Sequence, residues 1–290
     1  MSNIGDVMQK LKYKLDRHTL QTIYFSLVRP KLEYASVVWD DCSEEQKNLL
    51  ENTQLFFARI VTGAKRGTSH ELLYNETSWS TLADRRNTCK LKLMHNIYHR
   101  NAPDYLLQLL PEKADNRYEL RNDNNLSQFD TRIEKFRKSV FPDCIRKWNN
   151  LPVEIREIDD KKEFILKTST VFKDNKLYNG VTRKLGIIHA QLRMRCSNLK
   201  EHLYSLHVSD TANCICSNEI ENCDHFFFSC QLYNDHRQAF LDKIIESVQH
   251  YDVTVNTKLL LFGNEKLPDA INMKVSILVE KFIHDTERFY

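Results

Sequence analysis

Long apolar runs, glycine and proline are scarce in this chain of 290 residues, which contains six glycines and six prolines. No segment approaches the ~20 consecutive apolar residues of a membrane span, which excludes a transmembrane helix. The first 16 residues are polar and charged, without the apolar core of a secretory signal peptide. Together with 28% charged residues, this composition is typical of a soluble globular protein. We therefore expect an intracellular location, the nucleus included.

Several motifs that carry chemistry are also absent. The sequence has no Gly-x-Gly-x-x-Gly, Walker loop, His-Glu-x-x-His or Gly-x-Ser-x-Gly, which excludes the usual nucleotide-binding, zinc-protease and serine-hydrolase signatures. Asp40 and Asp41 are adjacent, so their side chains point in different directions. A solvated turn explains this pair better than a two-carboxylate metal site. We find no catalytic constellation.

Acidic residues are missing from two stretches, and the charge is unevenly distributed. Residues 1–213 hold 35 Lys and Arg against 27 Asp and Glu, whereas residues 214–290 hold 7 against 12. Residues 85–103 and 181–200 contain no acid. The cations concerned are Arg85, Arg86, Lys90, Lys92, Arg193 and Arg195. On charge alone, a phosphate-contacting surface and an ordinary solvated face explain them equally well.

Apolar spacing and capping residues predict a mostly α-helical fold. Ser43 and Gln46 have the spacing of a capping box, and the helix that they begin ends at Gly63, a residue typical of the C′ position. Pro30 is expected to separate a helix over residues 18–28 from a short one over 30–39. Further helices are expected at residues 81–99 (capped by Ser80), 142–148, 163–174, 198–204, 225–250 and 271–290, with a strand at 257–262, a loop or linker at 111–131 and a turn at 179–180.

Four of the eight cysteines fall within residues 214–230, together with His225. Thiolates and imidazole are the ligands of closed tetrahedral zinc sites. The sequence therefore predicts a structural zinc ion held by Cys214, Cys216, His225 and Cys230, with Cys223 as a fifth candidate that could replace one of them. Unrelated buried thiols are the alternative, and a reducing compartment disfavours a disulfide.

The spacing also limits what this cluster can do. The offset of five residues between His225 and Cys230 exceeds one helical turn, so we expect an irregular helix start near His225. With every ligand position filled by protein, no place remains for a reactive water. A deaminase site would need a glutamate two residues after its histidine ligand, and Phe227 stands there instead.

Four segments together resemble one known family. They are residues 20–42 (LQTIYFSLVRPKLEYASVVWDDC), 54–63 (QLFFARIVTG), 141–152 (FPDCIRKWNNLP) and 190–237, which includes LRMRCSNLKEHLY and CICSNEIENCDHFFFSCQLY. The chain resembles the C-terminal region of jockey-like non-LTR retrotransposon reverse transcriptases, downstream of the polymerase palm. The resemblance covers nearly the whole chain, and the Arg-Pro-x-Leu-Glu-Tyr motif at residues 29–34 is its most specific part.

The resemblance implies a thumb followed by a zinc-binding segment that helps to hold template RNA and target DNA. Matched by position, the resemblance implies the same four zinc ligands that are named above, although Ser217 stands where the family usually has glycine. The palm motif Tyr-x-Asp-Asp is absent, so we expect the chain to be a fragment, a truncated copy or a late-starting gene model that does not polymerise alone.

These observations combine into one prediction. The chain should be mostly α: a helical thumb-like bundle (residues 1–110), a helical middle region with a linker (111–180) and a small Cys/His zinc-stapled C-terminal unit (181–290). Its expected function is non-catalytic binding of RNA or DNA through the six cations listed above, by sequence-independent phosphate contacts. The alternative is an inactive relic or a helical protein-interaction module.

Overall fold

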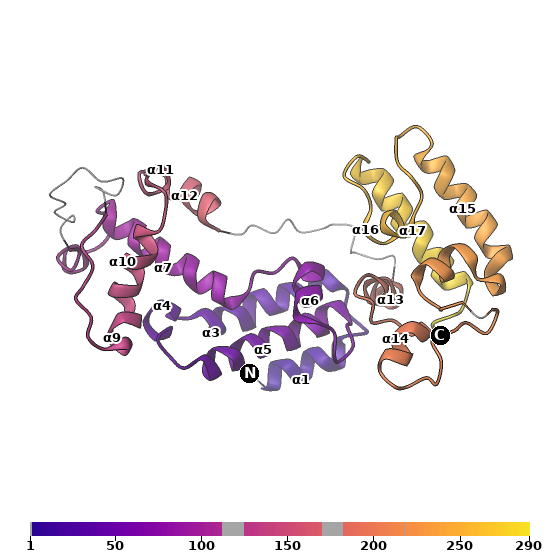
Figure 1. Cartoon of the computed structure of the whole chain (residues 1–290), viewed down its shortest axis with the longest axis horizontal. Coiled ribbons are helices and arrows are strands. Elements are labelled where there is room, and N and C mark those ends of the chain that lie inside the picture. Colours follow the sequence, from indigo (N-terminus) through magenta and orange to yellow (C-terminus); the bar gives the residue numbers. More distant parts are fainter. Residues whose placement is uncertain (1, 112–124, 170–181, 218) are drawn as a thin grey trace. The chain divides into compact units, whose positions relative to one another are not determined.

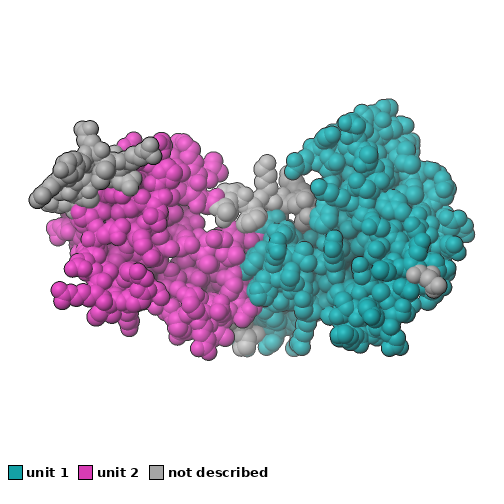
Figure 2. Space-filling model, viewed as in Figure 1, with its two compact units in different colours: residues 1–28, 55–78, 174–290 teal, residues 29–54, 79–173 magenta. Residues whose placement is uncertain are grey.

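The computed structural model describes residues 2–111, 125–169, 182–217 and 219–290 (Figure 1). These described residues are mostly α-helical and contain no β-strand, only an isolated bridge, which confirms the predicted fold class. None of the described helices is long and apolar enough to cross a membrane. The chain divides into two compact units (Figure 2).

Unit 1 is assembled from three separate stretches, Met1–Val28, Leu55–Ser78 and Asp174–Tyr290, and unit 2 from Arg29–Gln54 and Trp79–Lys173. The sequence-based regions are consecutive, whereas the compact units are not. The expected loops at 111–131 and 179–180 fall largely or wholly outside the described residues.

Unit 2 contains the first half of α5 (Glu44–Thr62) and the helices that flank it in this part of the chain. They are α3 (Arg29–Glu33), α4 (Ser36–Trp39), α7 (Leu82–Tyr98), α8 (Asp104–Leu107), α9 (Glu134–Lys138), α10 (Val140–Asn149), α11 (Val153–Arg156) and α12 (Lys161–Thr168). The core of unit 2 is the junction of α7, α10 and α12, where Trp148 lies 5.6 Å from Phe164 between ring centroids. Burying such a side chain contributes about 1.5–3 kcal/mol.

Unit 1 holds the remaining elements. They are α1 (Ser2–Leu11), α2 (Arg17–Ile23), the π-helical η1 (Tyr24–Val28), the second half of α5, α6 (His70–Thr77), α13 (Arg183–Arg193), α14 (Lys200–Ser205), the π-helical η3 (His225–Ser229), the 3-10 turn η4 (Gln231–Tyr233), α15 (Asn234–Val248), α16 (Thr257–Phe262) and α17 (Asp269–Asp285). Its main core lies between α13, α15, α16 and α17 (Figure 1). Phe226 and Phe227 of η3 enter this core, and Phe240 stacks on Phe282 at 4.6 Å.

The capping box at the start of α5 has the predicted geometry. The amide of Ser43 donates to Gln46 Oε1 and the amide of Gln46 donates to Ser43 Oγ, both at 3.3 Å. At the other end Gly63 has a positive φ of 76°, and its amide donates to the carbonyl of Arg59. A Cβ built on Gly63 would lie 2.6 Å from Ile187, so the turn needs glycine for space as well as for φ.

Several predicted elements differ from the structure. The cap of α7 is Thr81, whose hydroxyl accepts a hydrogen bond from the amide of Asp84, and not Ser80. The helix expected at 225–250 is divided into η3, η4 and α15.

Helical structure continues past Pro30 instead of stopping, because the π-helical turn η1 precedes the proline and α3 begins at Arg29. The expected strand at 257–262 is wrong: it is helix α16, whose N-cap Asn256 accepts a hydrogen bond from the amide of Leu259 at 2.9 Å. A short apolar run does not distinguish a buried strand from a buried helix.

Candidate metal centre

The first two cysteines of the cluster lie on a tight hairpin in unit 1. An antiparallel bridge joins Asn213 to Ile220, and the amide of Cys214 donates to the carbonyl of Glu219 at 2.8 Å. Cys216 lies in the turn that these two pairs enclose. The hairpin therefore presents two thiols from residues only two positions apart.

His225 is the first residue of the π-helical turn η3, and Cys230 is the residue that caps its end. On an ideal α-helix, residues five positions apart are about 140° apart around the axis, because each residue turns about 100°. In η3 the amide of Cys230 instead donates to the carbonyl of His225 at 2.7 Å, which closes a wider turn. Asn222 holds the start of this turn by accepting a hydrogen bond from the amide of His225. The expected irregular helix start is thus present, and it lets both side chains reach the hairpin.

Four side chains meet at this point. The sulfur of Cys214 is 3.7 Å from that of Cys230, which is 3.6 Å from the sulfur of Cys216. Nε2 of His225 is 3.3 Å from the Cys216 sulfur. All four ligand atoms lie within 4.8 Å of one another, so this group can hold a metal ion. Within the described ranges, no other group of His, Cys, Asp and Glu is arranged in this way.

A second layer of contacts orients the ligands. Nδ1 of His225 lies 2.9 Å from Oε2 of Glu219, and a proton donated from Nδ1 leaves the lone pair of Nε2 facing the sulfurs. Buried Arg237 donates to the carbonyls of Phe227 and Cys230, which fixes the end of the π turn. Both partners were missed from the sequence, where no spacing rule links them to the ligands.

The three thiols of the cluster differ in pKa, although burial acts to raise the pKa of each. Burial raises the pKa of Cys214 and raises that of Cys230 to about 12. For Cys216, burial also acts to raise the pKa, but hydrogen bonds from the Ser217 hydroxyl and the Gln231 amide outweigh it and bring the pKa to about 6. Three thiols this close cannot all ionise without a nearby positive charge. A bound cation would supply that charge, which is why metal binding and thiol deprotonation are coupled.

Cys223, the fifth candidate, lies outside the cluster. It packs against the main core of unit 1, and its sulfur lies 4.0 Å from the carbonyl of Leu192. Burial raises the pKa of this thiol to about 12. All eight cysteines are free thiols in the structure.

No family model, curated protein or solved structure matches this chain. The resemblance to retrotransposon reverse transcriptases therefore remains a prediction based on the quoted segments.

The expected basic side of α7 is mostly engaged in ion pairs within unit 2. Nζ of Lys90, 2% exposed, lies 2.5 Å from Asp40 Oδ2 and 2.6 Å from Asp143 Oδ2. Buried Arg86 lies 2.6 Å from the other oxygen of Asp40. The prediction of a solvent-facing basic surface is wrong for these two cations, because acids from outside the acid-free stretch neutralise them. Asp40 and Asp41 lie in the predicted turn, but the carboxylate of Asp40 pairs with Arg86 and Lys90, so the predicted solvation is wrong for Asp40.

The other expected phosphate contacts have mixed surroundings. Arg85 donates twice to the carboxylate of Glu33, whereas half-buried Lys92 has no ion-pair partner among the described residues. In unit 1, Arg193 is buried against Glu76, with both Nε and Nη2 at 2.8 Å from its carboxylate oxygens, so its expected exposure is also wrong. Arg195 is exposed. Of the six cations expected to contact phosphate, Lys92 and Arg195 thus reach solvent without a carboxylate partner among the described residues.

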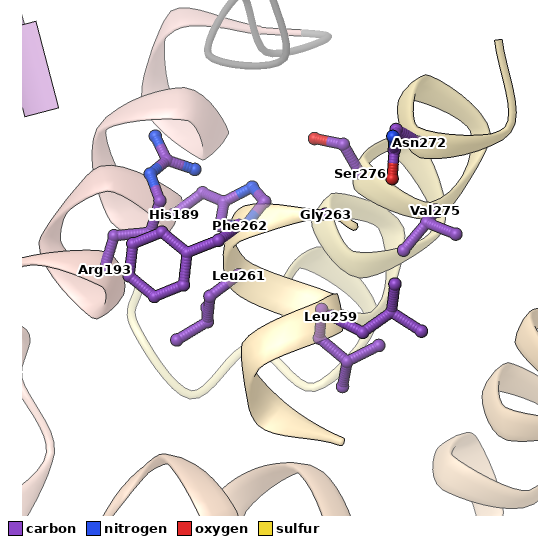
Figure 3. Close-up of a pocket in the computed structure, with 10 residues that line it drawn as sticks. His189, Arg193, Leu259, Leu261, Phe262, Gly263, Asn272, Val275 and Ser276 are labelled. Carbon is purple, nitrogen blue, oxygen red and sulfur yellow. The ribbon is translucent and has the colours of Figure 1, made fainter. Parts of the chain in front are cut away.

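A small cavity beside α16 offers no substrate site. Its volume is about 10 Å³, enough for about one water molecule. Figure 3 shows His189 and Arg193 on one side of it and Asn272 and Ser276 on another. Nε2 of His189 is buried and has no hydrogen-bond partner among the described residues, so a single water fits both the space and the chemistry.

Proposed function

We propose that this chain is a non-catalytic, nucleic-acid-binding part of a retrotransposon-type reverse transcriptase, stabilised by one structural zinc ion. The distances within the Cys/His cluster carry the zinc part of this proposal. Tetrahedral zinc with Zn–S near ~2.3 Å and Zn–N near ~2.05 Å has S···S edges of about 3.8 Å and S···N edges of about 3.5 Å. Two of the three S···S separations here are 3.6 and 3.7 Å, one of the three S···N separations is 3.3 Å, and all four ligand atoms lie within 4.8 Å of one another.

The ligand set indicates a structural role for the ion. Three thiolates and one imidazole would fill all four positions of tetrahedral zinc, so no position remains for a reactive water. Such an ion would join the hairpin to η3 and thereby hold the Phe226–Phe227 pair in the core of unit 1. The ion would therefore contribute directly to the folding free energy of this segment.

The nucleic-acid part of the proposal is supported by the resemblance and by the excess of positive charge in residues 1–213. Burial of Arg86, Lys90 and Arg193 in ion pairs rules out half of the cations that were expected to reach phosphate. Exposed Arg195 and half-buried Lys92 remain available, and phosphate contacts of this kind give affinity without sequence reading.

Zinc content tests the first part. We expect one zinc per chain in the parent protein and its loss in His225→Ala and in Cys230→Ser, with local unfolding. The matched controls Cys223→Ser and His236→Ala change the same residue types outside the cluster and should retain zinc. A folded, reduced parent without zinc would overturn the metal site.

Salt-dependent RNA binding tests the second part. The logarithm of the affinity should fall linearly with the logarithm of salt concentration. Arg195→Gln should reduce the magnitude of this slope by about 0.7, the value for neutralising one phosphate of a single strand. A zinc-loaded protein that does not bind RNA or DNA at low salt contradicts this part.

One observation favours a protein-interaction module as the second candidate. Large apolar side chains are exposed on and near the hairpin, with Ile215 77% and Val208 70% exposed. A zinc-loaded chain with no affinity for nucleic acid would favour this candidate over the first.

A further inference from the structure

Residues 129–138 of unit 2 expose an aromatic and aliphatic surface that the core does not use. Phe129, Ile133 and Phe136 are 37%, 67% and 48% exposed. The two rings contact each other edge-on, with centroids 6.2 Å apart and planes at 65°. None of these three side chains belongs to the hydrophobic core around Trp148. Large apolar groups held together at the surface indicate a binding function.

Positive charge surrounds these rings. Arg132, Lys135, Arg137 and Lys138 are all exposed, against Asp130 and Glu134 in the same ten residues. Arg137 and Lys138 pair with Glu134, but these side chains are all more than half exposed, and such pairs contribute only about 0–1 kcal/mol. Arg132 and Lys135 have no carboxylate partner among the described residues. The surface therefore presents an excess of cations that a polyanion can reach.

The combination fits single-stranded nucleic acid better than other polyanions. Unpaired bases can stack on exposed rings while their phosphates contact lysine and arginine, whereas the bases of a duplex are stacked on one another. A stable protein interface takes about 20–30 residues from each side, and an interfacial membrane helix buries a continuous apolar face in the headgroup region. The surface here has ten residues, and α9 has five.

We infer that residues 129–138 bind single-stranded RNA or DNA, with bases on Phe129 and Phe136 and phosphates on Arg132 and Lys135. The inference rests on the proposed function, because it assumes that the chain binds nucleic acid. It assigns the contact to unit 2, independently of the metal centre in unit 1. It also assigns the phosphate contacts to solvent-exposed cations, in place of Arg86 and Lys90 of α7, which are buried.

Fluorescence anisotropy of the full chain with a labelled 12-nucleotide uridine or thymidine oligomer tests the inference. Stacking on aromatic side chains contributes about 1–3 kcal/mol per base, so Phe136→Ala should weaken binding about 5- to 140-fold. Lys135→Gln should lower the salt slope by about 0.7. Matched controls in the same unit are Tyr105→Ala, an aromatic residue 65% exposed, and Lys162→Gln, an exposed lysine; both should bind as the parent does.

The outcomes separate the two proposals. Oligomer binding by the parent that Phe129→Ala, Phe136→Ala and Lys135→Gln leave unchanged overturns this surface and leaves the proposed function standing. Equal affinity for a blunt duplex overturns the single-strand assignment. Loss of binding to phosphatidylserine vesicles in Phe136→Ala, with oligomer binding unchanged, overturns it in favour of a lipid surface. If the parent binds no oligomer while it carries zinc, both nucleic-acid proposals fall.

Discussion

Glu76 is the central acid of a buried ion-pair network in unit 1, and replacing it should destabilise the protein strongly. Oε1 lies 2.6 Å from Nη1 of Arg17, and the carboxylate accepts two hydrogen bonds from Arg193 at 2.8 Å. The side chains of Glu76 and Arg193 are each 2% exposed and that of Arg17 is 10% exposed. Glu76→Gln keeps the shape but removes the negative charge that pairs with two buried guanidinium ions.

The expected loss is about 3–5 kcal/mol of unfolding free energy, the usual effect of removing one partner from a buried ion pair. With a urea m-value near ~3 kcal/mol/M, this lowers the denaturation midpoint by about 1–1.7 M. Far-UV circular dichroism measures it, since all the structure around Glu76 is helical. Glu71→Gln on the same helix α6 is the control: Glu71 is exposed, and its interaction with the helix dipole is worth about 0.3–1 kcal/mol.

The same network predicts a pH dependence. Burial acts to raise the pKa of Glu76, but Arg193 and Arg17 outweigh it and hold the pKa below its usual value of 4.5. A lowered folded-state pKa stabilises the protein above the unfolded-state pKa, and this stability is lost as the pH falls through the folded-state pKa. The difference in unfolding free energy between the parent and Glu76→Gln should therefore be constant near neutral pH and shrink below about pH 4.5.

Two results would refute this reasoning. One is a loss below ~1 kcal/mol for Glu76→Gln, no larger than that of an exposed pair. The other result would come from a triple variant in which Arg17, Glu76 and Arg193 are all replaced by apolar residues of similar volume. We expect this replacement to leave the unfolding free energy unchanged or to raise it by about 1–4 kcal/mol. A triple variant less stable than Glu76→Gln would show that packing, and not unpaired charge, explains the single variant.

Three further predictions concern other parts of the fold. Lys90→Met leaves two carboxylates of unit 2 without their shared cation and should lower the unfolding free energy by about 3–5 kcal/mol. The control Lys92→Met should lower it by about 0.5 kcal/mol. Tryptophan fluorescence follows the unfolding of unit 2, because all three tryptophans lie in that unit. Gly63→Ala and Gly67→Ala both place a side chain at positive φ, but only the methyl group at position 63 meets a neighbour. Thermal unfolding should therefore show Gly63→Ala to be about 1–3 kcal/mol less stable than Gly67→Ala. Glu219→Gln weakens the orientation of the histidine ligand and should lower zinc affinity about 10- to 100-fold in competition with a chromophoric chelator.

Local signals in the sequence were sufficient where local interactions decide the structure. The Ser43–Gln46 box and Gly63 predicted both ends of α5, because caps are formed by residues within a few positions of each other. The cluster of Cys214, Cys216, His225 and Cys230 was predicted because thiols and imidazole have few reasons to crowd together. The offset between His225 and Cys230 even indicated the irregular turn, although not that it is a π turn.

Long-range partners were beyond the reach of the sequence. An acid-free helix looks like a basic surface, yet Asp40 and Asp143 approach Lys90 from 50 and 53 positions away. Such pairing depends on tertiary packing, which neither composition nor periodicity records. The exposed surface at 129–138 was missed for a different reason. Its alternation of Phe, Ile, Lys and Arg is visible in the sequence, but part of it falls in a stretch assigned to a loop or linker on its polar composition.

The Arg17–Glu76–Arg193 network sets an order of events during synthesis. Its members lie 59 and 117 positions apart, one in each of the three stretches that form unit 1. At about 5–20 residues per second, Arg193 is made roughly 6–23 s after Glu76. During that interval Glu76 can pair with Arg17 but lacks Arg193, and the apolar side chains of the first two stretches have no α13 to cover them. Contacts so distant in sequence slow folding, so the nascent chain has a window in which chaperones or aggregation compete with unit 1.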